Sequence, residues 1–316
     1  MGINQTTFDY FQILGLSDDP TIKPLLFCVL LLIYIMALLG NLTIILVSQL
    51  EQRLHTPMYF FLTNLSFLDI CYTSTTMPKM LQALVVEKKT ISFVGCGIQL
   101  YFFFACVGTE CVLLGIMSYD RFVAICNPLQ YSVVMNHKVT YNLAGVSWSS
   151  GLLNSIVHTV VTFDLNFCDS NQINYFFCDI PPLLSLACDD TFLNELLLQS
   201  IGVFIAWTPF LGIIVSYICI IVAIMKIRSS KGRQKAFSTC LSHIIVVILY
   251  YGSSISNYVR PTSTHSLDKD RVISVIYSVV TPMLNPIIYT LKNQDVKEAL
   301  FKYILYIKKN KLLKKL

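Results

Sequence analysis

Charge is what this chain has least of. Lys, Arg, Asp and Glu make up only 13% of its 316 residues, while 55% are hydrophobic; soluble proteins carry about 25% charged residues. The mean hydropathy is +0.64. So little charge excludes a pair of water-soluble domains. The net charge of +5 is also small, and we expect no nucleic-acid partner.

Catalytic and targeting motifs are missing as well. Outside the apolar runs we find no metal-spaced His/Cys cluster, no nucleophile elbow and no phosphate-binding loop, so neither an enzyme nor a cofactor is expected. The first 24 residues hold three aspartates and no early basic region, which does not fit a cleavable signal peptide.

Long apolar runs are what the sequence has in abundance. A helix needs roughly 20 residues to cross a hydrocarbon core about 30 Å thick. Polar residues dilute the third, sixth and seventh runs, which is typical of helices that face a protein interior. The sequence predicts an all-α membrane protein, a seven-transmembrane helix bundle. Its spans are Leu25–Val47, Met58–Leu81, Ile98–Ser118, Leu143–Val161, Leu197–Ile224, Ile244–Val259 with a polar lead-in from Ala236, and Val272–Leu291.

Basic residues are unevenly distributed between the loops. With the N-terminus outside, 16 of the 23 Lys and Arg residues fall in the inner loops and tail, and 12 of the 18 acids fall outside. The positive-inside rule then predicts an extracellular segment 1–24, a seven-helix domain 25–291 and a cytoplasmic tail 292–316 in the plasma membrane. Asn4 begins a glycosylation sequon on the outer side. The lysines at the end of the tail suit anionic membrane lipid.

Four of the eleven cysteines fall outside the predicted spans: Cys96, Cys168, Cys178 and Cys188. An even number in an oxidising compartment indicates two disulfides, and four cysteines allow three pairings. The spacing alone does not choose between them.

Two acids lie deep within predicted spans. Asp69 and Glu110 are each about 11–12 residues from an inner end, roughly 16–18 Å deep at 1.5 Å per residue. Two ionised acids at one depth would repel each other. They therefore share a Na⁺ ion, or else form a protonated, hydrogen-bonded polar core.

Two further features point to a conformational switch. Asp120 and Arg121 end the third run, where the acid can restrain the arginine in one state and release it in another; a lone arginine would instead extend to the interface. In the seventh run Pro282 and Pro286 free backbone carbonyls, for which Asn285 offers hydrogen bonds. This segment is a hinge candidate or simply a bent helix.

Taken together, several segments make the chain resemble the olfactory receptors, a branch of the rhodopsin-like G-protein-coupled receptors. The resemblance covers nearly the whole chain, and Tyr258–Pro261 is similar to the tetrapod-expanded class. Phe122 departs from the usual Tyr, and the sixth run lacks the Trp and Pro typical of other rhodopsin-like receptors. The matching segments are Gly40-Asn41, Leu54–Phe60, Leu65–Asp69, Met117–Cys126, Ser216-Tyr217, Lys235–His243 and Pro282–Tyr289.

The resemblance implies disulfides Cys96–Cys178 and Cys168–Cys188, and a ligand cavity between the outer halves of the third, fifth, sixth and seventh spans. Helical spacing selects the side chains that share a face there, although inter-helix packing is the competing interpretation for each. The cavity is apolar with a few hydroxyl groups, which favours a small, mainly neutral, volatile odorant. The predicted lining is Phe103, Phe104, Val107, Gly108, Cys111, Ile201, Ile205, Tyr251, Ser254, Ile255, Tyr258, Ser274 and Ser278.

On the inner side the resemblance implies coupling to a heterotrimeric G protein of the olfactory, stimulatory type, which raises cyclic AMP in sensory-neuron cilia. The basic third inner loop suits an acidic partner surface, or only anchors the topology. Residues 293–306 are expected to form a short amphipathic helix on the membrane, with Val296, Ala299, Leu300, Tyr303 and Ile304 on its inward face. The predicted switch residues are Asp120, Arg121, Tyr217, His243, Asn285, Pro286 and Tyr289.

A ligand-gated channel or transporter is the rival class, because Asp69 and Glu110 could line an ion path. Against it stand the absence of paired half-repeats and of charged rings in the sequence. The same receptor used as a chemosensor outside olfaction would share this sequence.

Overall fold

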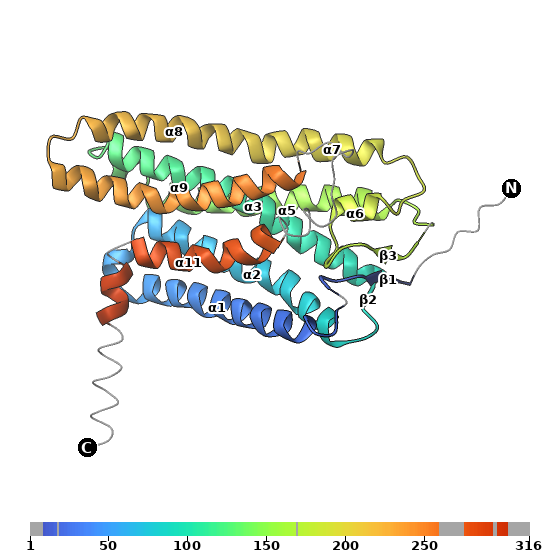
Figure 1. Cartoon of the computed structure of the whole chain (residues 1–316). Coiled ribbons are helices and arrows are strands. Elements are labelled where there is room, and N and C mark those ends of the chain that lie inside the picture. The colour runs from blue at the N-terminus through green and yellow to red at the C-terminus, as the bar shows by residue number, and fades with distance from the viewer. Residues whose placement is uncertain (1–8, 18, 169, 259–274, 293–295, 303–316) are drawn as a thin grey trace, which may run out of the picture.

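The computed structural model describes residues 9–17, 19–168, 170–258, 275–292 and 296–302. Over these residues the chain is mostly helical, and its long helices lie side by side in a bundle (Figure 1). The first four long helices are α1 (Lys23–Leu50), α2 (Pro57–Val85), α3 (Phe93–Cys126) and α5 (His137–Phe163). The next is continuous through three parts: α7 (Phe192–Gly202), the π-helical segment Val203–Trp207 and α8 (Thr208–Met225). The last two are α9 (Ser230–Tyr258) and α11 (Thr281–Lys292), which follows the π-helical segment Ile276–Val280.

The helices extend beyond the apolar runs that predict them. α3 has 34 residues and begins at Phe93, because Ser92 caps it by accepting a hydrogen bond from Gly95 N. Asn136 caps α5 in the same way through Val139 N. Capping residues are polar, so a search for apolar residues alone ends short of the true boundary.

Four of the described helices are long and apolar enough to cross a membrane: Lys23–Leu50, Phe93–Cys126, Phe192–Met225 and Ser230–Ser254. α1 shows what such a surface looks like. Its residues Leu25, Leu32, Leu39 and Leu46 recur every seventh position and are each 58% to 65% exposed. A leucine row of this kind is stable against lipid rather than water.

α3 lies at the centre of the bundle and contacts α2, α5, α8 and α9. Its approach to α5 depends on glycine. A Cβ atom on Gly151 of α5 would lie 2.6 Å from the Thr109 backbone nitrogen and would also collide with Ala105 O. The missing side chain therefore sets how closely α3 and α5 pack.

A small sheet lies at one end of the bundle (Figure 1). β1 (Tyr10–Ile13) pairs antiparallel with β2 (Thr90–Ser92) and parallel with β3 (Gln172–Ile173). The disulfide Cys96–Cys178 ties the N-terminal end of α3 to the segment after β3, and Cys168–Cys188 joins the chain before β3 to the chain 20 residues further on. These are the pairs that the resemblance implied.

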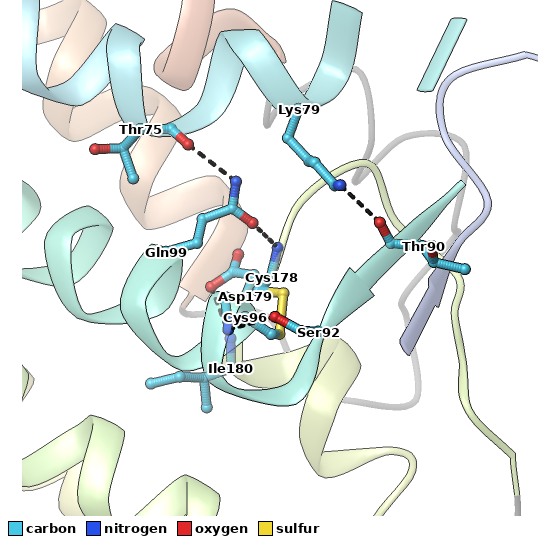
Figure 2. Close-up of a disulfide and its surroundings, with 10 residues drawn as sticks. Thr75, Lys79, Thr90, Ser92, Cys96, Gln99, Cys178, Asp179 and Ile180 are labelled. Atoms are coloured by element: carbon cyan, nitrogen blue, oxygen red, sulfur yellow. Dashed lines mark hydrogen bonds between the residues drawn. A yellow bond between two sulfur atoms is a disulfide. The ribbon is translucent and has the colours of Figure 1, made fainter. Parts of the chain in front are cut away.

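Gln99 reinforces the first disulfide, as Figure 2 shows. Its side-chain nitrogen donates to Thr75 O at 2.9 Å, and its side-chain oxygen accepts from Cys178 N at 3.0 Å. One side chain thereby joins α2, α3 and the loop that follows β3. Asp179 then accepts a hydrogen bond from Ile180 N and begins α6 (Ile180–Leu184).

The described part of the tail contains a helical stretch at residues 296–302. Val296 and Ala299 are buried, whereas Phe301 and Lys302 are exposed. The stretch is amphipathic, as expected. Tyr303 and Ile304, also expected on the inward face, lie outside the described residues.

Candidate ligand cavity and inner polar cluster

A cavity of about 490 Å³ opens between α3, α5, α7 with its π-helical continuation, and α9. This volume is within the range of small-molecule sites. The lining consists of Phe104, Val107, Gly108, Cys111, Asn154, His158, Leu198, Gln199, Gly202, Val203, Ile205, Ala206, Trp207, Tyr250, Tyr251 and Ser254.

Seven of the residues predicted for the cavity line it: Phe104, Val107, Gly108, Cys111, Ile205, Tyr251 and Ser254. Phe103 does not. It is fully buried and packs against Tyr72 and Phe177, with ring centroids 5.3 and 4.8 Å apart. Ile201 is also absent from the lining, because Leu198, Gln199 and Gly202 present the inner face of α7.

The seventh helix contributes no described residue to the cavity wall. Ser278 is buried in the π-helical segment Ile276–Val280, which packs against α1, α2 and α9. Ser274 lies outside the described residues, and the side chains of Ile255 and Tyr258 are not described either. Asn4, the predicted glycosylation site, is likewise outside the described residues.

α5 supplies a polar wall that sequence reasoning missed. Gly151, Asn154 and His158 are spaced i, i+3 and i+7, so they share one helix face. Because Gly151 brings that face against α3, the next two turns place Asn154 and His158 in the cavity wall. The His158 ring lies 5.6 Å from the Phe104 ring. The sequence did carry a signal for this wall, because Asn154 and His158 are two polar residues on one face of an otherwise apolar run.

Two tyrosines of α9 close the inner end of the cavity against α3. Tyr250 Oη donates to Val107 O at 2.8 Å and lies 3.3 Å from Cys111 Sγ. Tyr251 Oη donates to Cys111 O at 3.3 Å. The sequence pointed to Tyr251 but not to Tyr250. Both hydroxyl groups are used between helices, so they cannot also donate freely to a ligand in this state.

Asp69 and Asn285 form the centre of the inner polar cluster. Asn285 Nδ2 donates to both carboxylate oxygens of Asp69, at 3.2 and 3.0 Å, and both side chains are buried. Glu110 is also buried and interacts electrostatically with Asp69. Glu110 Oε1 and Asn285 Oδ1 have no hydrogen-bond partner among the described residues. Two orphaned oxygens beside a carboxylate are the donor set that a hard cation prefers.

The hydrogen bonds at the proline-rich segment differ from the expected pattern. Pro286 has no N–H, so it leaves Pro282 O without its helical donor. Asn41 Nδ2 in α1 supplies that donor at 3.1 Å, while Asn285 is engaged by Asp69. Asn285 does bond to one of the two buried acids, but it does not replace this bond as predicted, because its side chain points toward α2. Gly40 permits the contact: a Cβ there would lie 2.8 Å from Pro286 Cγ.

Asp120 and Arg121 point to different partners. Asp120 Oδ1 accepts a hydrogen bond from Tyr131 Oη at 2.8 Å, and Tyr131 belongs to α4 (Tyr131–Val134). Burial raises the pKa of the Tyr131 phenol, so it remains the donor. Arg121 donates to Met58 Sδ at the start of α2. No ion pair joins Asp120 to Arg121 among the described side chains; Asp120 bonds to α4 and Arg121 to α2, and the predicted restraint stays a prediction.

Tyr217 and His243 join α8 to α9 near the inner end. Tyr217 Oη lies 2.7 Å from His243 Nδ1, and the two rings are stacked with centroids 5.8 Å apart. Arg121 interacts electrostatically with Tyr217, His243 and Tyr289. His243 Nε2 and Tyr289 Oη are buried with no described partner. The structure brings together the side chains predicted to converge here.

Comparison with known proteins agrees with this architecture. A sequence model of the olfactory receptor family matches residues 27–308. Mouse olfactory receptor 5AP2 is 48% identical over 301 residues, covering 95% of each chain. Human olfactory receptor 5AP2 is 47% identical over 96% of each chain. Human olfactory receptor 1F1 is 48% identical over 96% of this chain and 97% of its own. The chain is a membrane protein that belongs to the olfactory receptor family of G-protein-coupled receptors.

Proposed function

We propose that this protein is an odorant receptor that crosses the plasma membrane seven times, with residues 1–24 outside, 25–291 forming the helical domain and 292–316 in the cytosol. α2 and α5 (29 and 27 residues) and the seventh helix complete the spans alongside the four that are apolar enough by composition. The loop charges favour this orientation. Glycosylation at Asn4 and transport to sensory cilia complete the proposal.

The observation that carries the ligand proposal is the 490 Å³ cavity, whose wall is mainly apolar but includes Asn154, His158 and Gln199. Burial of hydrocarbon at about 25 cal/mol per Å² would supply most of the affinity. One hydrogen bond to this polar side would add about 1 kcal/mol. We therefore expect a small, neutral, volatile molecule with an apolar body and a single polar group, such as a ketone, ester or alcohol.

The proposed signal passes from α9 to the inner cluster. Tyr250 and Tyr251 contact both the cavity and α3, and His243 lies on the same helix two turns further in. A ligand that prefers another position of α9 would shift that equilibrium by its differential affinity. The inner end would then bind a heterotrimeric G protein of the stimulatory, olfactory type and raise cyclic AMP.

We also propose that Asp69 and Glu110 hold Na⁺. Glu110 Oε1 and Asn285 Oδ1 are the orphaned oxygens that support the proposal. The cation would neutralise a buried charge that the described side chains leave without a basic partner. Weaker thermal stabilisation by NaCl than by KCl or choline chloride would count against it.

The test is an odorant panel applied to cells that report cyclic AMP. Ketones, esters and alcohols of matched size should be compared with the corresponding hydrocarbons. We expect responses that disappear in Arg121→Ala, and a preference for polar over hydrocarbon ligands that falls about tenfold in the pair Asn154→Leu and His158→Phe. Tyr119→Phe, on the exposed face of α3, is the matched control. A ligand-gated current without G protein would overturn the receptor mechanism in favour of a channel.

A further inference from the structure

A second cavity, of about 270 Å³, lies where the connection from α1 to α2 meets the beginning of α5. We refer to it as the inner-rim cavity. It is lined in part by Leu54–Pro57, which connects α1 to α2 and does not line the ligand cavity. Its lining is polar and aromatic and includes Ser48, His55, Thr56, His137 and Tyr141.

Electrostatics at the inner-rim cavity favour an anion. Two long helices begin there, α2 at Pro57 and α5 at His137, and helix N-termini carry partial positive charge. Thr56 makes no side-chain cap to α2, and Pro57 has no N–H to offer. His137 adds ring nitrogens to the wall, whereas His55 Nε2 is already bonded to Gln49 O at 3.0 Å. The nearby acid, Glu51, is already paired with Lys302 at 2.7 Å.

Ser48 is an independent sign that a ligand is missing. Its residue is only 5% exposed, it lines the cavity, and its Oγ has no hydrogen-bond partner among the described residues. A buried hydroxyl group without a partner costs about 1–3 kcal/mol. A phosphate oxygen in the cavity would accept the missing hydrogen bond.

An aromatic seam leads away from the inner-rim cavity between α2 and α5. Phe60 and Tyr141 line the cavity, and their ring centroids are 4.8 Å apart. Seven residues further along both helices, Phe67 and Trp148 form a second pair at 5.8 Å. Seven residues advance a helix by roughly 10 Å. Tyr141 and Phe67 are 60% and 53% exposed, so the seam faces outward.

We propose that the inner-rim cavity binds the phosphate headgroup of an anionic phospholipid of the inner leaflet, with its acyl chain along the aromatic seam. The phosphate monoester of phosphatidic acid matches the two helix N-termini, His137 and the Ser48 hydroxyl group, and the seam gives the hydrocarbon a continuous apolar path. The proposal rests on the inner placement of the α1–α2 connection but not on odorant recognition or G-protein coupling.

The test uses the purified full chain in phosphatidylcholine nanodiscs. The chain has two tryptophans, so Trp207→Phe leaves Trp148 as the only emitter, within the seam. Phosphatidic acid or phosphatidylcholine, each with brominated acyl chains that quench tryptophan on contact, is then added at increasing mole fraction. We expect phosphatidic acid to reach half-maximal quenching at about tenfold lower mole fraction than phosphatidylcholine.

Variants distinguish a specific phosphate site in the inner-rim cavity from general electrostatic attraction between the protein and an anionic lipid. His137→Gln and Ser48→Ala should each remove most of the preference for phosphatidic acid. Ser48→Ala should leave the protein without added phosphatidic acid as stable as the parent, because the lost hydroxyl group has no partner. Lys231→Gln removes an exposed charge elsewhere and is the matched control; we expect no change.

Three results would overturn the proposal. Equal quenching by the two lipids would remove the anion preference. Displacement of phosphatidic acid by inorganic phosphate at equal concentration would indicate a soluble anion instead of a lipid. Cholesterol that protects Trp148 from quenching, with loss of that protection in Ser48→Ala, would identify a sterol as the occupant. No odorant or G protein is present, so failure here is separate from failure of the proposed receptor function.

Discussion

The outer half of α3 borders a cavity, whereas its inner half is packed against other side chains. From Phe104 to Cys111 the helix faces a cavity of about 490 Å³, crossed at its base by the hydroxyl groups of Tyr250 and Tyr251. The inner half, toward Arg121, instead adjoins buried polar side chains of α8 and α9, where Tyr217 Oη lies 2.7 Å from His243 Nδ1.

Different interactions therefore dominate at the two ends of α3: non-directional burial at the cavity and directional hydrogen bonds at the inner end. An apolar cavity with few fixed hydrogen bonds tolerates many ligand shapes, because burial is not directional. Buried hydrogen bonds such as Tyr217–His243 are directional, so they favour a few discrete arrangements. If the proposed function holds, the cavity would give graded ligand recognition and the inner cluster a discrete switch, and the experiments below test that contrast.

The largest effect is expected at Gly151, where α3 and α5 meet. Gly151→Val would place side-chain atoms in Ala105 and Thr109 and force the helices apart. We expect a loss of about 3 kcal/mol in the free energy of unfolding, measured by thermal unfolding of purified protein. Gly145→Ala on the same helix is the control, because its Cβ would meet nothing within 4 Å. Equal losses in both variants would show that glycine flexibility, rather than close approach, is required.

Asn285→Ala removes both described donors to the Asp69 carboxylate. Leaving a buried acid without them should cost about 2 kcal/mol of stability. The exchange Asp69→Asn with Asn285→Asp keeps one amide and one acid and should recover part of that loss in a double-mutant cycle. If the losses of the single variants simply add, the two residues are not coupled and the inner cluster is looser than its geometry indicates.

Tyr217→Phe removes the hydroxyl group that lies 2.7 Å from His243 Nδ1. The cost should be about 1 kcal/mol, and it should appear as a changed ratio of basal to odorant-stimulated cyclic AMP, because the bond joins α8 to α9 in this state. Leu198→Ala, in the part of the cavity wall that α7 supplies, should instead change ligand preference and leave basal signalling alone. If the Tyr217 variant changed only ligand preference and the cavity-wall variant changed basal signalling, the proposed division between the cavity and the inner cluster would be wrong.

The smallest effect concerns the attachment of residues 296–302. The hydrogen bond from Lys302 lowers the pKa of Glu51 below its usual 4.5. A lowered pKa means that the contact stabilises the folded state above pH 4.5, and that this contribution disappears as the pH falls through the lowered value. The protection of the amides of residues 296–302, measured as their exchange rate relative to the intrinsic rate at each pH, should therefore fall in acid. Glu51→Gln should exchange faster at neutral pH and lose this pH dependence, while Lys297→Gln should match the parent.

Much of the architecture was readable from the sequence because it depends on local periodicity. Apolar runs located the helices, and the side chains around Arg121 were predicted to converge. The α5 wall of the cavity was missed, since it depends on how closely Gly151 approaches α3. The role of Asn285 was also misread: periodicity gives the face of a residue but not which of two nearby partners it bonds.

Sequence alone determined that this chain is an apolar helical membrane protein of the olfactory receptor family, because composition and short motifs can be read without knowing how the helices pack. Tertiary structure alone decided which side chains share the cavity, that Asn41 satisfies the carbonyl released by Pro286, and that Asp120 and Arg121 bond to Tyr131 and Met58. Each of these choices is made between residues far apart along the chain, where contact distance follows from helix packing and not from spacing.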